Sequence, residues 1–199
     1  IFSSLLLYNF LITIYYTTLF DIIVMRCAMK LLEEKILNDG KILEDNIIKV
    51  DSFLNHRLET DFLNKLAEEI SRYFSGRGIN KILTIEASGI ALAILTAYHM
   101  DNIPVVFAKK SKSKNIEGDV FSSQVKSYTY DKTYSVTVSK KYLSQGDRLL
   151  IIDDFLATGL AMEGLIDISN QACAEIKGLS VAVEKGFQKG GDSLREKGY

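Results

Sequence analysis

The sequence is poor in the residues that build disulfide frameworks and metal centres. Its 199 residues include only two cysteines, two histidines and one proline, and tryptophan is absent. Cys27 and Cys173 lie far apart and match no metal-ligand spacing. They indicate free thiols in a reducing compartment, and therefore a cytoplasmic protein without a disulfide framework. No Ser-His-Asp or Cys-His signature is present either, which argues against covalent nucleophilic catalysis.

An excess of charge of either sign is also missing. There are 24 lysine and arginine residues against 25 aspartate and glutamate residues, which gives a formal net charge of −1. This balance argues against a protein that binds nucleic acid non-specifically. The hydrophobic content of 47% and the charged content of 25% are those of an ordinary globular protein, and the chain is long enough for one domain with a sizeable core.

Residues 1–28 differ from the rest of the chain. Asp21 is the only charged residue among the first 25. As a helix this stretch would span roughly 37 Å, against about 30 Å for the hydrocarbon core of a bilayer. A basic cluster before the apolar run, typical of a signal peptide, is absent. We expect a non-native leader, with a membrane anchor as the alternative, and a single domain over residues 29–199 that makes no membrane contact.

The first part of this domain is predicted to contain two helices. Residues 30–37 form a short amphipathic pattern that ends near Gly40, and residues 61–75 place six apolar side chains on one stripe. Thr60 is a candidate N-cap of the second helix. Between the helices, residues 45–57 alternate apolar and polar side chains and indicate extended chain or a loop.

The remainder predicts two β-α-β units. Runs that are apolar on both faces alternate with helical patterns, which is typical of a parallel sheet covered on both sides. The first unit comprises strand 81–86, helix 90–100 and strand 105–110, and the second comprises strand 148–153, helix 159–173 and strand 179–184. The fold class is therefore α/β: an open, mostly parallel twisted sheet with helices on both faces. Between the units we expect a loop over 111–123 and a hairpin around Asp131-Lys132.

The segment LLIIDDFLATG (149–159) carries the clearest chemical signal. Asp153 and Asp154 are expected to leave the strand at its carboxyl end, where ligands bind in open α/β sheets. The small residues of the following turn, and the N-terminus of a helix that starts near Gly159, suit a phosphate monoester. The two acids can accept hydrogen bonds from sugar hydroxyls or hold a hydrated Mg²⁺. A sugar phosphate would satisfy both halves of the motif, although an acid pair of this kind also occurs in phosphoacceptor domains.

With a preceding EASG turn at 86–89, IIDDFLATG resembles the signature by which type I phosphoribosyltransferases bind 5-phosphoribosyl 1-diphosphate. The segments VDSFLNHR (50–57), PVVFAKKSKS (104–113) and VEKGFQ (183–188) stand in the order and approximate spacing of bacterial members that act on xanthine. The resemblance covers about residues 29–199. The resemblance implies a longer chain than this one. We therefore expect the last strand of the hood over the base to be missing.

The resemblance implies a purine-salvage enzyme. It would transfer the phosphoribosyl group to xanthine, use Mg²⁺, and form XMP and diphosphate as a homodimer. The fold would include a small hood and a flexible hairpin loop. Two alternatives stay open: a preference for guanine or hypoxanthine, and a non-catalytic regulator on the same fold, which would need a basic face for nucleic acid.

The resemblance also implies a role for each matching position. The catalytic residues would be Asp153, Asp154 and Lys110, and the two acids could hold the metal through water. The ribosyl diphosphate would be bound by Ala157, Thr158, Gly159, Leu160, Ala161, Ser88 and Lys109. The purine would be bound by Ile48, Asn55 and Lys185. Lys185 would donate to a 6-oxo group, and such a site can reject a 6-amino purine by about 10⁴-fold.

Overall fold

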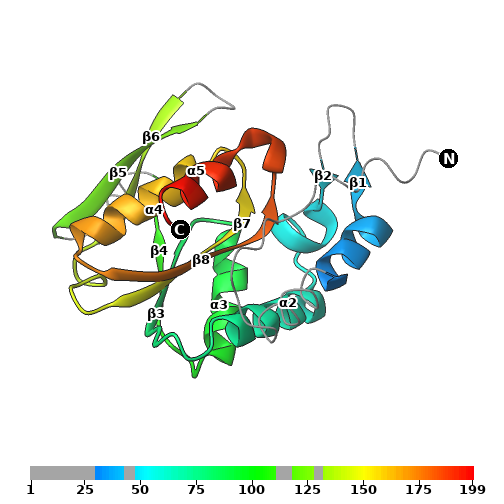
Figure 1. The fold of residues 1–199 in the computed structure, drawn as a ribbon, viewed down its shortest axis with the longest axis horizontal. Coiled ribbons are helices and arrows are strands. Elements are labelled where there is room, and N and C mark those ends of the chain that lie inside the picture. Colours follow the sequence, from blue (N-terminus) through cyan, green and yellow to red (C-terminus); the bar gives the residue numbers. More distant parts are fainter. Residues whose placement is uncertain (1–29, 43–47, 111–117, 128–131) are drawn as a thin grey trace.

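The computed structural model describes residues 30–42, 48–110, 118–127 and 132–199. Its centre is a four-stranded sheet in the order β4-β3-β7-β8, in which all three pairings are parallel (Figure 1). The strands are β3 (Lys81–Ile85), β4 (Val105–Ala108), β7 (Arg148–Leu156) and β8 (Glu175–Glu184). The predicted α/β class and parallel sheet are therefore confirmed.

Helices connect the parallel strands as predicted. Helix α3 (Gly89–His99) joins β3 to β4, and α4 (Leu160–Gln171) joins β7 to β8. Helix α2 (Thr60–Tyr73) packs against α3. The prediction that Thr60 caps α2 is wrong, because Thr60 is the first helical residue and the preceding Glu59 makes no side-chain cap.

Strand β7 separates two hydrophobic cores. Leu150 and Ile152 are fully buried with residues of α2 and α3, whereas Leu149 and Ile151 are fully buried with residues of α4 and the hairpin. This division follows from the period-two alternation of side chains along a strand. It explains the continuous apolar run, because both faces of β7 are covered.

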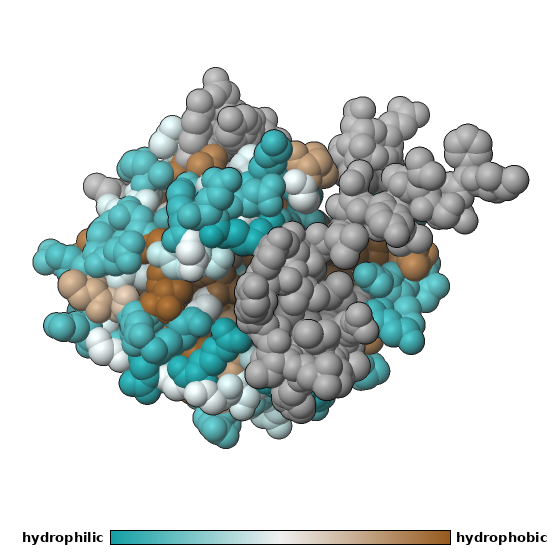
Figure 2. Space-filling view, viewed as in Figure 1, coloured by the Kyte–Doolittle hydropathy of each residue, from teal (hydrophilic) through white to brown (hydrophobic). Residues whose placement is uncertain are grey.

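On the viewed side, much of the coloured outer surface is hydrophilic (Figure 2).

The hairpin is longer than the sequence predicts. It consists of β5 (Val120–Ser127) and β6 (Lys132–Ser139), which pair antiparallel along their whole length. The predicted loop over 111–123 is therefore wrong for its last residues, and residues 111–117 lie outside the described part. Two backbone hydrogen bonds of 2.9 Å between Lys109 and Thr137 fasten β6 to the end of β4.

The N-terminal elements lie together at one end of the molecule (Figure 1). A helix over residues 30–39 ends at Gly40, as predicted, and is followed by β1 (Lys41–Ile42) and β2 (Ile48–Lys49). The chain then forms η2 (Asp51–Asn55), a π-helical turn. The prediction of extended chain or loop over 45–57 is wrong for this turn. Its buried Phe53 and Leu54 join the core that contains α2.

The expectation for residues 1–28 lies outside the described residues. Among the helices that the structure does describe, none combines the length and the apolar character needed to cross a bilayer.

Candidate ribosyl diphosphate and purine site

The two acids lie inside β7 and not beyond it. Strand β7 continues to Leu156, and Asp153 and Asp154 are 8% and 6% exposed. The prediction that they leave the strand is therefore wrong in detail. The strand is longer than predicted because the apolar residues Phe155 and Leu156 follow the acids and extend the pairing with β8. The carboxyl groups are consequently held by a rigid element near the carboxyl edge of the sheet, where a ligand is expected.

Asp153 carries the strongest electrostatic perturbation of the site. Its pKa is raised well above the ordinary value, first by burial and then by the charge of Asp154 and an interaction between the two side chains. The backbone N–H of Asp154, 2.9 Å from Asp153 Oδ1, and the positive charge of Lys110 partly oppose this shift. A nearby hydroxyl donor or cation would reduce the free-energy cost of ionising both buried carboxyl groups. The pair therefore favours ligands that carry hydroxyl groups or a positive charge.

The predicted phosphate turn follows β7 directly. Gly159 is the N-cap of α4 and has a left-handed backbone with φ of 84°, which glycine adopts without strain. No side chain caps this helix end, so the first N–H groups of α4, beginning at Leu160 and Ala161, remain for a ligand. Thr158 is half-buried beside them. The geometry is that of an anion site at a helix N-terminus.

The 86–89 turn lies against the acids. Gly89 begins α3 so close to β7 that an added Cβ would lie 2.9 Å from Asp153 Oδ1 and 2.4 Å from Thr84 Oγ1. The preceding Ser88 is half-buried, and the peptide bond between Glu86 and Ala87 is cis. The missing side chain of Gly89 therefore lets the start of α3 lie directly against Asp153.

Lys109 and Lys110 are positioned from two directions. The backbone N–H of Lys110 donates to Glu86 Oε1 over 2.6 Å, and Lys109 is bound to Thr137 of the hairpin. Because Lys110 is exposed and its charge reaches Asp153, the structure brings the predicted basic and acidic residues to one edge of the sheet.

The predicted purine residues come from separate elements. Lys185 directly follows β8, and its Nζ lies 5.1 Å from the ring centroid of Phe155. Asn55 is exposed at the end of η2, whose buried residues share a core with Val183 and Phe155. This shared core places η2 near the carboxyl end of the sheet. Ile48 belongs to β2, but its side chain is not among those described.

Two residues of this region were not predicted from the sequence. Phe155 lies under the Lys185 ammonium group, and Tyr134 of β6 is half-buried with Lys110 Nζ 6.0 Å from its ring centroid. The pKa of Tyr134 is raised by burial and by the negative charge of Asp153, so the phenol lies within electrostatic reach of that carboxylate. Phe155 follows the acid pair directly and could have been found from that position. No local signal identifies Tyr134, because its partners are distant in sequence.

The donor set fits a metal shared with the substrate. Within the described residues no cluster of three or more histidine, cysteine, aspartate or glutamate side chains could hold a metal on its own. Mg²⁺ typically keeps several waters and binds one or two carboxylates together with substrate phosphates. Asp153 and Asp154 could hold it in this way, through water.

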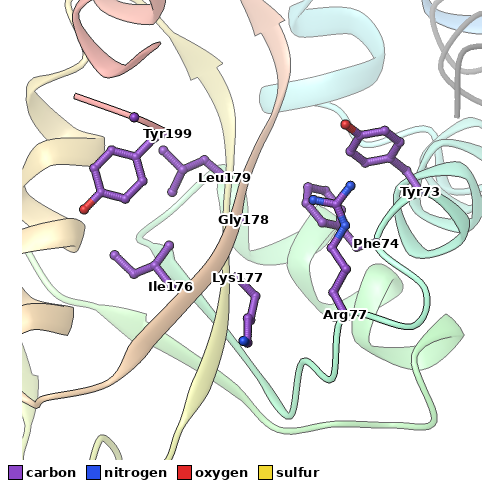
Figure 3. Close-up of a pocket in the computed structure, with 9 residues that line it drawn as sticks. Tyr73, Phe74, Arg77, Ile176, Lys177, Gly178, Leu179 and Tyr199 are labelled. Atoms are coloured by element: carbon purple, nitrogen blue, oxygen red, sulfur yellow. The ribbon is translucent and has the colours of Figure 1, made fainter. Parts of the chain in front are cut away.

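A hollow of about 310 Å³ lies elsewhere, along the outer side of the sheet. It is formed around β8 by residues that include Tyr73, Phe74, Arg77, Gly178 and Tyr199. Figure 3 shows Tyr199 and Leu179 on one side of the β8 ribbon and Phe74 and Arg77 on the other. None of the predicted site residues lines it, so it is distinct from the site at the carboxyl edge.

The structure is thus an α/β protein with a parallel sheet, a buried acid pair and an uncapped helix N-terminus at the carboxyl edge of that sheet. The phosphoribosyl transferase domain family matches residues 49–192. The chain belongs to the phosphoribosyltransferase family.

Curated relatives extend this likeness to most of the chain. Xanthine phosphoribosyltransferase 2 of Clostridium botulinum is 54% identical over 170 residues, which cover 85% of this chain and 90% of the relative. Xanthine phosphoribosyltransferase of Bifidobacterium adolescentis is 50% identical over 171 residues, covering 86% and 89%.

Solved structures show the same fold. Adenine phosphoribosyltransferase of Giardia lamblia, in complex with 9-deazaadenine, superposes with a TM-score of 0.69 at 22% identity, covering 83% of this chain and 92% of that one. The adenine phosphoribosyltransferase of Rhodothermus marinus gives a TM-score of 0.67 at 22% identity, with the same coverage.

Proposed function

We propose that the protein is a purine-salvage enzyme that transfers the phosphoribosyl group of 5-phosphoribosyl 1-diphosphate to xanthine, forming XMP and diphosphate. The observation that carries this proposal is the identity of about half of the residues to relatives named for this activity, over most of both chains. The site supports it, because one edge of the sheet brings together an acid pair, a phosphate turn and basic residues.

We assign the sugar end of the substrate to β7 and the turn after it. The ribose hydroxyls would donate to Asp153 and Asp154, and the 5-phosphate would accept from the N–H groups and hydroxyl of the 157–161 turn. Buried carboxylates near the sugar ring also supply a negative field. That field stabilises the positive charge that develops on the anomeric carbon as its bond to diphosphate breaks.

We assign the leaving group to the opposite side of the sugar. Ser88, Lys109 and Lys110 would bind the diphosphate and stabilise its negative charge as the bond to the anomeric carbon breaks. Bound Mg²⁺ would supply further neutralisation of the diphosphate oxygens. The electron pair of a purine nitrogen then forms the new bond to carbon, and the proton of that nitrogen is released. No protein nucleophile takes part.

The base would lie between the hood and the end of β8. Lys185 would donate to the 6-oxo group, and Ile48 and Asn55 would contact the rest of the base. The position of Lys185 over Phe155 supports this role, because the aromatic ring holds the ammonium group at the strand end. We extend the proposal to a homodimer that works in the cytoplasm, as the family resemblance implies.

The test is product formation from the ribosyl diphosphate and Mg²⁺ with xanthine, guanine, hypoxanthine and adenine in parallel. We expect efficient turnover of xanthine and the least turnover of adenine. Asp154→Asn should weaken use of the ribosyl diphosphate far more than binding of the base. Saturable binding of the ribosyl diphosphate without turnover of any base would support the regulator instead.

A further inference from the structure

The chain after Lys185 turns back onto the phosphate turn. It forms the short η3 (Gly186–Gln188) and then α5 (Gly190–Glu196), which lies beside α4 (Figure 1). Two backbone hydrogen bonds fix this return. The N–H of Lys185 donates to Leu156 O over 2.7 Å, and the N–H of Gly190 donates to Ala157 O over 3.1 Å.

At Gly190 the two backbones are in direct contact. An added Cβ there would lie 2.3 Å from Ala157 O and 2.5 Å from Gly159 N, well inside van der Waals distance. From the other side, a Cβ on Gly159 would lie 3.2 Å from Gly190 Cα. The atoms in the way belong to backbone, so no side-chain rotation can make room for a methyl group.

The hydrogen bond at Gly190 also sets the direction of an amide in the turn. In a trans peptide unit the C=O and the N–H point in opposite directions. Because Ala157 O points at Gly190, the N–H of Thr158 points away from the C-terminal segment. That N–H is one of the donors that the sugar phosphate would meet.

Helix α5 is fastened so that it can hold this contact. Arg195 forms a bidentate pair with Glu184 at the end of β8, over 2.9 and 3.2 Å, and this pairing raises the pKa of Arg195. Lys197 pairs with Glu163 of α4, and Leu194 is buried in the core beneath. The C-terminal segment is thus attached to the end of β8 and to α4, the helix that follows the phosphate turn.

We propose that Gly190 is a positioning residue for the phosphate turn. Its backbone supports the turn from the side away from the ligand, orients the Thr158 amide, and does so only because it lacks a side chain. This inference rests on the proposed function and adds to it a residue that does not touch substrate.

The test is Gly190→Ala, assayed for both substrates. A displaced turn should raise the KM for the ribosyl diphosphate about 10- to 100-fold, since misplacements near 1 Å cost on this scale. The KM for xanthine should change less than about twofold, because the base meets Lys185 and the hood. The control is Gly178→Ala, where a Cβ would meet the Phe74 ring at 2.2 Å, away from the site. It should lower the melting temperature and leave both KM values unchanged.

Arg195→Gln provides a second route if Gly190→Ala does not fold. It loosens α5 without touching the turn, and should raise the KM for the ribosyl diphosphate several-fold. Equal changes in both KM values, or none in either variant, would overturn the inference. If the wild-type protein does not turn over xanthine, the proposed function fails, and calorimetric titration with the ribosyl diphosphate and Mg²⁺ makes the same comparison without turnover.

Discussion

Asp153→Asn should make the protein more stable and less active. The carboxyl group is buried beside Asp154, and its pKa is raised by burial and by that neighbouring charge. A raised pKa means that the folded state binds this proton more tightly than the unfolded state does. The free energy of unfolding therefore falls as pH rises from about 4 towards the raised pKa. Asparagine is neutral at every pH and avoids this loss.

The size of the effect follows from the linkage relation. Each unit by which the pKa is raised corresponds to about 1.4 kcal/mol. For a domain of this size, 1 kcal/mol moves the melting temperature by about 2–4 °C. The hydrogen bond from the Asp154 N–H, at 2.9 Å, can be kept by the Asn oxygen. Loss of a charged acceptor for a ribose hydroxyl should lower kcat/KM by about 10- to 150-fold, because such bonds contribute about 1.5–3 kcal/mol.

The assay is thermal unfolding between pH 5 and 8, followed by steady-state kinetics at neutral pH. Asp147→Asn serves as the control. Asp147 is also buried, but its Oδ2 lies 2.7 Å from Lys81 Nζ and accepts from the N–H of Ser144. Its replacement should destabilise the protein by on the order of 2 kcal/mol, because the half-buried Lys81 loses its charged partner and keeps only the Tyr142 carbonyl as an acceptor.

The reasoning would be refuted if Asp153→Asn melted at or below the wild-type temperature throughout this range. A stability gain that shrank as pH rose would contradict it equally, because the sign of the linkage would then be reversed.

Three further predictions concern the rest of the site. Lys185→Ala should narrow the preference for 6-oxo over 6-amino purines, measured as the ratio of the kcat/KM values for hypoxanthine and adenine. An unchanged ratio would mean that Lys185 is a solvated side chain that does not contact the base. Gly89→Ala should lower the unfolding free energy by about 1–3 kcal/mol and disturb Asp153. The control Gly146→Ala lies in open space at a left-handed φ of 97°, so it should also destabilise the protein but leave activity unchanged. Glu86→Ala should remove the acceptor of the Lys110 N–H and raise the KM for the ribosyl diphosphate about tenfold, with little change in melting temperature.

The sheet and its helices were predictable because their signals are local. Each of the strands β3 and β7 is an apolar run followed by a turn of small residues. This pattern predicts a strand, a turn and a helix in that order. The η2 turn was missed for a physical reason. Val50, Phe53 and Leu54 stand at the i, i+3, i+4 spacing of a helix, but the stretch is only one turn long and follows an alternating run.

The site was predictable only in part. The acid pair and the phosphate turn are contiguous, so one motif reveals both. Tyr134 and Gly190 reach the same place through hairpin packing and chain reversal, which depend on contacts between residues far apart in sequence. Even within the motif, the extension of β7 past the acids required the pairing with β8.

The position of β7 between two cores has a consequence for motion. Each layer of helices depends on this strand, so neither can open without exposing it, and the domain should unfold in a single cooperative transition. Amide hydrogens of β7 should then exchange with solvent only through global unfolding, more slowly than those of the hairpin. The acids would thus sit on the most protected strand of the molecule, and any opening and closing around the substrate would fall to the elements that surround it.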